Sequence, residues 1–284
     1  MDIKKILAVG TAIVGTVAMA DVVSSSVVGY QNVKLNAGGK NMVGACFVSV
    51  GGKSVKLSEL KVTGYEKSVY YLTEELGFTA TFQRRASNGM PYATYGWTDS
   101  TDDMATWSGG KWINVVTGED ITAENDVEFN PGDGLWFSTP DLQDCTGFSL
   151  TTSGTVLKGD QAFELNAGGK IGVANMMPVP VKLSEIEIHG YENSMYYLTE
   201  ELGFTMTMQS LKSNGMPQAT YGWTDSTEDM ANWNGGKWIN VTTGEDITSE
   251  KDVTVAAGEG FWASCPDLQD CEKFTFVVPQ ALAE

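Results

Sequence analysis

Cysteines, a histidine and carboxylates are the residues of this 284-residue chain that could do chemistry. No C-x-x-C pair and no histidine close to a cysteine favours a metal site, so the four cysteines are expected to form disulfides, which requires export from the cytosol. Two cysteines lie in each of two similar parts of the chain. The simplest pairing keeps each bond inside one part and joins Cys46 to Cys145 and Cys265 to Cys271.

Catalytic groups are harder to find in the sequence. His189 is the only histidine, and no G-x-S-x-G motif supplies a nucleophile for it. Paired carboxylates such as Glu74 and Glu75 could serve a glycosidase, but with 36 acidic residues such pairs arise without any function. We therefore expect a non-enzymatic protein and keep a secreted hydrolase as the third hypothesis.

Two acidic segments are candidates for calcium binding, TDSTDD at 98–103 and TDSTED at 224–229. Their closely spaced carboxylate and hydroxyl oxygens are ligands that Ca²⁺ prefers, although the order lacks the alternation and central glycine of an EF-hand loop. The alternative is that Asp99 or Ser100 caps a short turn. Calcium is the one cofactor considered, and its candidate ligands are Asp99, Asp102, Asp103, Asp225, Glu228 and Asp229.

Tryptophans next to amides suggest a different kind of site. In KWINV at 111–115, alternation along a strand puts Ile113 and Val115 on one face and the tryptophan and asparagine on the other. An exposed indole can stack on a sugar while an amide bonds its hydroxyls, which predicts carbohydrate binding. The alternative is that a loop or the other part of the chain covers the indole. The candidate residues are Trp112, Asn114, Trp238 and Asn240.

These residues occur in pairs because the sequence contains an internal repeat. Between Val55–Cys145 and Val181–Cys271, a shift of 126 residues matches 65 of 91 positions without a gap. LNAGGK at 35–40 returns 130 residues later, so the first copy has four extra residues, which we place near Gly51. Such a match indicates two copies of one structural unit.

Short β-rich runs separated by turn clusters are typical of the whole chain, and no long stretch repeats at the helical period. The sequence therefore predicts an all-β fold of two tandem homologous antiparallel β-sandwich-like modules after a signal peptide, with one helical turn at 57–60. The expected boundaries are a first module at 21–150, a polar linker at 151–158, a second module at 159–279 and a C-terminal tail at 280–284.

Residues 1–20 have the pattern of a secretory signal, with two lysines, an apolar run and an A-x-A cleavage site. The run is too short to span a bilayer comfortably, so we expect no membrane insertion after cleavage and a secreted, periplasmic or cell-surface location. Cleavage leaves 16 basic and 35 acidic residues, a net charge of −19. This charge argues against nucleic acid as a partner.

Two short motifs resemble a family of exported bacterial β-sandwich modules found in surface proteins. In that family, L-x-x-G-W-N opens the unit and P-G-x-G-Y-W closes it. Here Leu35, Gly39 and Asn41 fall near the first motif, with Lys40 in the tryptophan position, and PGDGLW at 131–136 fits the second with leucine for tyrosine.

The second copy departs further from this pattern, because Ile171 replaces the asparagine and Ala257 replaces the proline. The resemblance implies a structural or adhesive role at the cell surface and carries over no catalytic residue. The leading hypothesis is thus an exported, non-enzymatic structural or adhesive protein, and the alternative is a carbohydrate-binding protein. The partners considered are polysaccharides or other surface proteins.

Overall fold

The computed structural model describes residues 28–66, 68, 80–86, 88–99, 110–121, 125–192, 194, 206–212, 214–225, 236–247 and 251–279. Within these ranges the chain is nearly all β, its strands pair antiparallel, and the helical elements are two 3-10 turns. The all-β prediction is confirmed. The sequence also predicts a hairpin at 68–82 with its turn near 74–77, and this turn lies outside the described residues.

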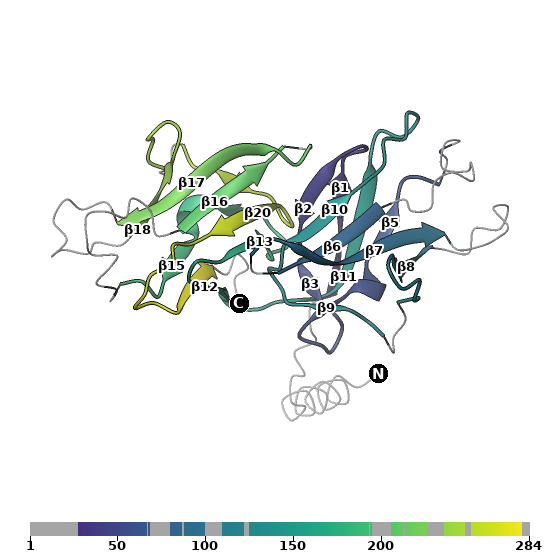
Figure 1. Cartoon of the computed structure of the whole chain (residues 1–284), viewed down its shortest axis with the longest axis horizontal. Helices are drawn as coiled ribbons and strands as arrows, with labels where there is room; N and C mark the ends of the chain where they lie inside the picture. The colour runs from purple at the N-terminus through teal and green to yellow at the C-terminus, as the bar shows by residue number, and fades with distance from the viewer. Residues whose placement is uncertain are drawn as a thin grey trace, which may run out of the picture.

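Residues 28–156, called the first half below, contain two sheets and a short ribbon (Figure 1). The larger sheet has, in order, β2 (Lys40–Val43), β10 (Leu135–Ser138), β6 (Ala80–Arg85), β7 (Pro91–Asp99) and β8 (Gly110–Asn114). The smaller sheet is formed by β11 (Phe148–Val156), which pairs with β1 (Val28–Leu35), β3 (Phe47–Val48) and β5 (Lys61–Thr63). The ribbon pairs β4 (Val55–Lys56) with β9 (Glu128–Phe129), and the 3-10 turn η1 (Leu57–Glu59) follows β4 where the sequence predicts a helical turn.

Residues 161–278, the second half, repeat this arrangement, except that no described strand there corresponds to β3. The larger sheet has, in order, β13 (Lys170–Ala174), β20 (Gly260–Ser264), β16 (Met206–Leu211), β17 (Pro217–Asp225) and β18 (Gly236–Asn240). The smaller sheet has β12 (Gln161–Asn166), β21 (Lys273–Val278) and β15 (Glu187–His189), and the ribbon pairs β14 (Val181–Lys182) with β19 (Thr254–Val255) beside η2 (Leu183–Glu185). Corresponding strands therefore occupy corresponding places in the two halves.

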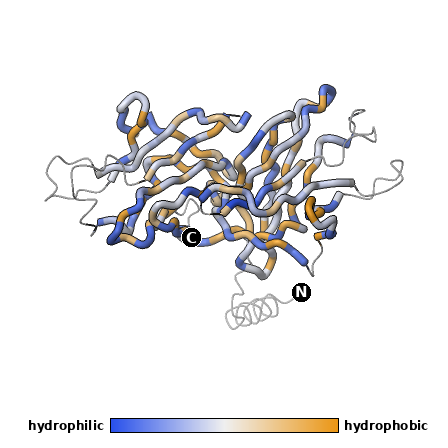
Figure 2. The backbone as a smooth tube through the Cα atoms, in the orientation of Figure 1, coloured by the Kyte–Doolittle hydropathy of each residue, from blue (hydrophilic) through white to orange (hydrophobic). Residues whose placement is uncertain are grey.

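Each half has its own hydrophobic core, to which both of its sheets contribute side chains. In the first half, Phe82 of β6 and Phe137 of β10 pack with Phe148 and Leu150 of β11, and all four are at most 2% exposed. Alternate residues of β11 point inward, as expected for a strand with one solvated face. Figure 2 shows apolar residues interspersed with polar ones along the chain in both halves.

Residues 151–158 are not simply a linker. Thr151 to Val156 form the second part of β11, which pairs with β1 and β3, so the smaller sheet of the first half extends past the predicted module boundary at 150. The polar composition is misleading because Thr152 is 1% exposed and Gly154 lies against the carbonyl of Val48, where a Cβ would be 2.0 Å from the oxygen. Only 157–160 connect strands of the two halves.

Candidate functional site

The tryptophans proposed for sugar stacking are buried. Trp112 is 1% exposed and Trp238 is 0% exposed, and their indole N–H groups donate to the carbonyls of Leu60 and Ile186 at 2.8 and 2.9 Å. Each packs edge-on against the neighbouring tryptophan of its half. The prediction that these indoles form an open platform is therefore wrong.

Strand β8 faces inward with the opposite set of side chains to the one predicted. Trp112 fills the core, Ile113 is half-buried and Val115 is 41% exposed, so the face that carries the large indole is the one that is buried. Asn114 accepts backbone hydrogen bonds from Val116 and Thr117 at 3.0 and 3.2 Å, and Asn240 does the same in the second half. Both asparagines thus close turns.

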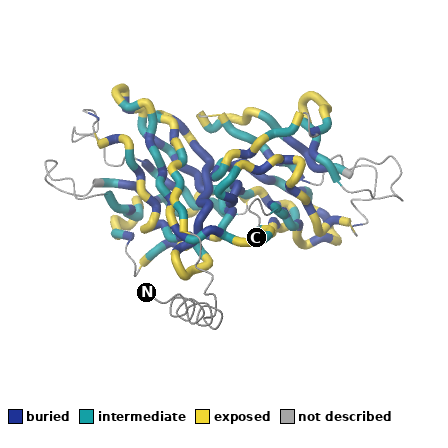
Figure 3. The backbone as a smooth tube through the Cα atoms, turned by 180° about the vertical axis from the view of Figure 1, so that it is seen from behind, coloured by how far each residue is buried: buried dark blue, intermediate teal, exposed yellow. Residues whose placement is uncertain are grey.

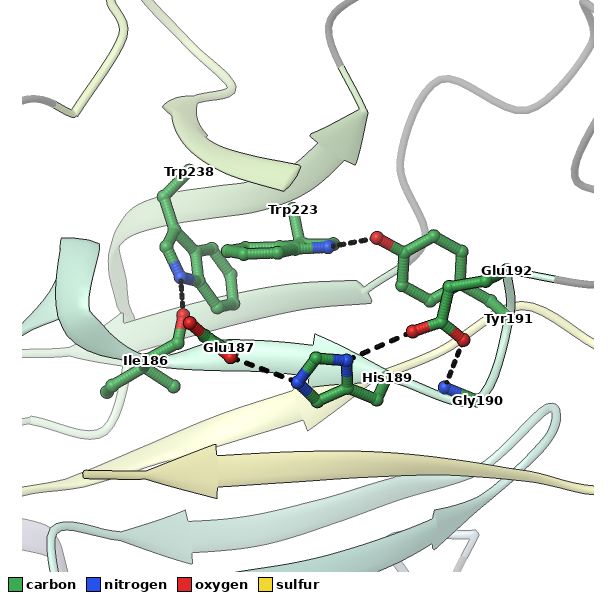
Figure 4. Close-up of polar contacts among 8 residues, drawn as sticks. All are labelled: Ile186, Glu187, His189, Gly190, Tyr191, Glu192, Trp223 and Trp238. Carbon is green, nitrogen blue, oxygen red and sulfur yellow. Dashed lines mark hydrogen bonds and ion pairs between the residues drawn. The ribbon is translucent and has the colours of Figure 1, made fainter. Parts of the chain in front are cut away.

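His189 lies at the surface between two carboxylates (Figure 4). Its Nδ1 is 3.0 Å from Glu192 and its Nε2 is 3.0 Å from Glu187. Partial burial lowers the pKa of His189, but the hydrogen bonds to Glu192 and Glu187 outweigh it and leave the pKa above the ordinary value. Since both ring nitrogens are engaged by acids, this imidazole is not directed at a nucleophile.

The predicted disulfide between Cys46 and Cys145 is not formed, and all four cysteines are free thiols. Cys46 lies where the halves meet, and its Sγ is 3.5 Å from the carbonyl of Asn175 in the second half. Burial raises the pKa of Cys46 to about 12. Cys145 lies elsewhere, with its Sγ 3.3 Å from the carbonyl of Gly64.

The second predicted pair is not bonded either, because each thiol donates to a different carbonyl. Cys265 contacts the carbonyl of Asn166 at 3.0 Å, and Cys271 contacts that of Gly190 at 3.2 Å. Burial raises the pKa of Cys265 to about 11 and also raises the pKa of Cys271. Thiols that act as nucleophiles have lowered pKa values, so these two resemble structural cysteines.

The calcium prediction falls mostly outside the described residues. Asp99 and Asp225 end strands β7 and β17, and the other four candidate ligands are not described. Among the residues that are described, no group of three or more histidine, cysteine, aspartate or glutamate side chains could hold a metal. Calcium binding stays a prediction.

The two halves meet along a seam formed by β2 and β10 of the first half and β13 and β20 of the second (Figure 1). The N–H of Gly44 donates to the carbonyl of Gly258 at 2.9 Å, and the N–H of Ala174 donates to that of Gly132 at the same distance. The repeat aligns Gly44 with Ala174 and Gly132 with Gly258, so these two bonds are equivalent. The seam therefore has approximate two-fold symmetry within one chain.

Further contacts follow the same symmetry. Each β-hairpin with the sequence NGMP reaches the opposite half, because Asn214 bridges to Lys40 and Asn88 bridges to Lys170. At the centre, the rings of Trp136 and Trp262 lie 5.7 Å apart. Figure 3 shows that buried segments are continuous across the middle of the molecule. The seam is thus packed as part of the protein interior.

One cavity of about 330 Å³, called the amide cavity below, opens beside the seam. This volume is at the lower end of the range for small-molecule sites. Four amide side chains and three lysines face one carboxylate and a few apolar residues. The polar lining residues are Gln31, Asn32, Lys34, Asn36, Lys40, Asn41, Lys212 and Glu259.

Two buried amide atoms in this cavity lack hydrogen-bond partners among the described residues, Oε1 of Gln31 and Nδ2 of Asn41. Asn41 is 8% exposed, and its Oδ1 accepts from the N–H and Nδ2 of Asn36 at 3.3 and 3.4 Å. The Nε2 of Gln31 donates to the carbonyl of Ala257 at 2.8 Å. Such unpaired buried atoms are rare in proteins, which makes this cavity the best candidate site.

The symmetry-related position holds a smaller cavity of about 130 Å³, the arginine cavity. Here Arg85 lies over the rings of Trp136 and Trp262, at 4.9 and 5.4 Å from their centroids. Its guanidinium also donates to the carbonyl of Gly89 at 2.8 Å, and burial lowers its pKa. Burial raises the pKa of the neighbouring Asp133 carboxyl even though the N–H of Asn130 donates to it.

Sequence reasoning missed both cavities. The useful signal was a difference between the copies, since Asn41 corresponds to Ile171 and Arg85 to Leu211. The departures from the surface-module pattern at Lys40 and Ile171 fall on the seam. The positions that match between the copies, such as Trp112 and Trp238, instead belong to residues that build the two cores.

No helix among the described residues is long and apolar enough to cross a membrane. Comparisons of the chain with protein-family models, with curated proteins and with solved structures gave no match.

Proposed function

We propose that two copies of one β-sandwich module form an exported, non-enzymatic protein with a structural or adhesive role at the cell surface or outside it. One observation carries this proposal: the six described tryptophans are all at most 9% exposed, two in each core and one on each side of the seam. Aromatic residues repeated in both copies therefore stabilise two cores and fix one half against the other.

The reactive groups support the same proposal. His189 is held between two acids, and the pKa values of three cysteines are raised, which is the opposite of an activated nucleophile. A two-part unit whose described tryptophans are buried suits a protein that contacts polysaccharides or other surface proteins over broad faces.

The test is to locate the protein in its source cells and then remove it. Antibodies should label intact cells or the extracellular fraction, and a deletion strain should lose attachment or cohesion, with recovery by the full-length chain but not by one lacking residues 1–20. Confinement to the cytosol, or turnover in a panel of glycosidase, esterase and peptidase substrates, would refute the proposal.

A further inference from the structure

We propose that the amide cavity binds an acidic sugar, meaning a small polyhydroxylated ligand with a carboxylate. The inference does not depend on the role proposed above, because it concerns a local site at the seam. It rests on the charge around the cavity, on the unpaired amides and on the contrast with the symmetry-related cavity.

The charge around the amide cavity is opposite to that of the protein. The chain has 36 acidic and 18 basic residues, yet the cavity is lined by Lys34, Lys40 and Lys212 and by a single carboxylate. That carboxylate, Glu259, accepts the N–H of Ala256 at 2.8 Å. None of the three lysines makes an ion pair with another described residue. The cavity therefore favours an anion.

The unpaired amides restrict the hydrogen-bonding groups of the ligand as well as its charge. Asn41 offers an unused N–H donor, which a carboxylate or hydroxyl oxygen can satisfy, and Gln31 offers an unused carbonyl acceptor, which needs a hydroxyl or amine hydrogen. Both side chains line the cavity. A sugar acid carries both complements, whereas an inorganic anion such as sulfate lacks the donor.

The arginine cavity occupies the symmetry-related position and lacks the features proposed to bind the ligand. Its volume is about 130 Å³ against about 330 Å³. Arg85 lies over the two seam tryptophans where Leu211 stands on the other side, and Ile171 replaces the amide of Asn41. The unpaired amide of Asn41 is not required by the seam itself, because the equivalent position holds the aliphatic residue Ile171.

Calorimetric titration of the purified, signal-cleaved chain with glucuronate tests the proposal. Glucuronate should bind, and binding should weaken as salt is raised, because the lysines are exposed and screened. Glucose and inorganic sulfate should each bind at least about tenfold more weakly. A polyuronate in a parallel titration distinguishes a free sugar acid from the end of an acidic polysaccharide. Equal binding of glucose, equal binding of sulfate, or no binding of glucuronate would each overturn the proposal.

Two variants locate the site. The triple variant Lys34→Gln, Lys40→Gln and Lys212→Gln should weaken glucuronate binding at least about tenfold. The matched control is the triple variant Lys53→Gln, Lys61→Gln and Lys182→Gln. It changes the net charge by the same amount, but these three lysines do not line the cavity, so glucuronate binding should be unchanged.

Asn41→Asp keeps the acceptor for Asn36 but replaces the free donor with an oxygen, so it should abolish binding. The melting temperature of every variant is measured alongside. If both lysine triples weaken binding equally, or if Asn41→Asp folds and binds normally, the ligand lies elsewhere.

Discussion

The two cavities of the seam are equivalent by symmetry but differ in what fills them. In the arginine cavity, the guanidinium of Arg85 lies over Trp136 and Trp262. In the amide cavity, Leu211 stands in that position, and Asn41 and Gln31 keep buried polar atoms that have no hydrogen-bond partner in the described part of the chain. The seam thus has two similar grooves, and a few residue differences make one of them smaller and the other larger and more polar.

The backbone of the seam is shared by both cavities, which explains how the side chains could diverge. Gly134 lines the arginine cavity and Gly260 lines the amide cavity, and each lies where the opposite strand leaves no room for a Cβ. Hydrogen bonds between backbone groups hold the halves together independently of the side chains that line either groove. The seam is therefore fixed, and each groove could change without separating the halves.

The largest effect is expected from Gly134→Ala. A Cβ there would lie 2.5 Å from the carbonyl carbon of Gly172, and backbone cannot yield as a side chain does. We expect a loss of about 3 kcal/mol in the free energy of unfolding, the upper part of the range for overpacking. Chemical denaturation followed by tryptophan fluorescence measures this.

Gly51→Ala is the control for this variant, because its Cβ would meet nothing within 4 Å and only the positive φ of 77° is unfavourable. It should cost about 1 kcal/mol. Equal losses for the two variants would mean that the close approach of the halves contributes nothing to stability.

Arg85→Leu makes the arginine cavity resemble its counterpart. The change removes two cation–π contacts and the hydrogen bonds to Gly89 and Gln83, and it also removes a buried Nε without a partner. The lost cation–π contacts and hydrogen bonds should outweigh the gain from removing the unpaired Nε. We therefore expect the free energy of unfolding to fall by about 1 kcal/mol. Thermal unfolding measures the change, and an increase in stability would show that the unpaired Nε outweighs the stacking.

Asn41→Ile gives the amide cavity the residue of its counterpart. The buried Nδ2 has no partner, and the hydrogen bonds accepted from Asn36 are long, at 3.3 and 3.4 Å. Removing an unpaired buried donor should leave the free energy of unfolding unchanged or raise it by up to about 1 kcal/mol. A loss greater than about 1 kcal/mol would show that Asn41 is a structural residue and not a retained binding group.

The repeat and the alternation of short strands predicted the all-β fold because both are properties of local sequence. The same alternation failed at Trp112, since a five-residue strand has two faces and the sequence does not say which lies inward. The linker prediction failed at Thr152 because polar composition does not reveal pairing with a strand more than 100 residues away.

The candidate site could not be predicted from the sequence because it, too, depends on contacts between distant parts of the chain. Gln31, Asn41 and Lys212 come together only because the halves associate through the seam. Pairwise comparison of the copies would have marked Asn41 against Ile171 as a difference. It would not have shown that this difference lies in a cavity, because neither copy alone reveals that β2 and β10 pack against β13 and β20.

The smallest expected effect concerns His189, which stands where the first half has Thr63. The pKa of His189 is raised in the folded chain, so its contribution to stability is present in full below its ordinary value of 6.5 and is lost as the pH rises through the folded value. His189→Thr should therefore lower stability near pH 5.5 by only a few tenths of a kcal/mol, since the imidazole is about half exposed, and should have no effect near pH 8. Melting curves at the two pH values measure the difference, with Glu187→Gln as the control that removes one acid and should reduce the effect. A loss of the same size at both pH values would mean that His189 acts through packing and not through its charge.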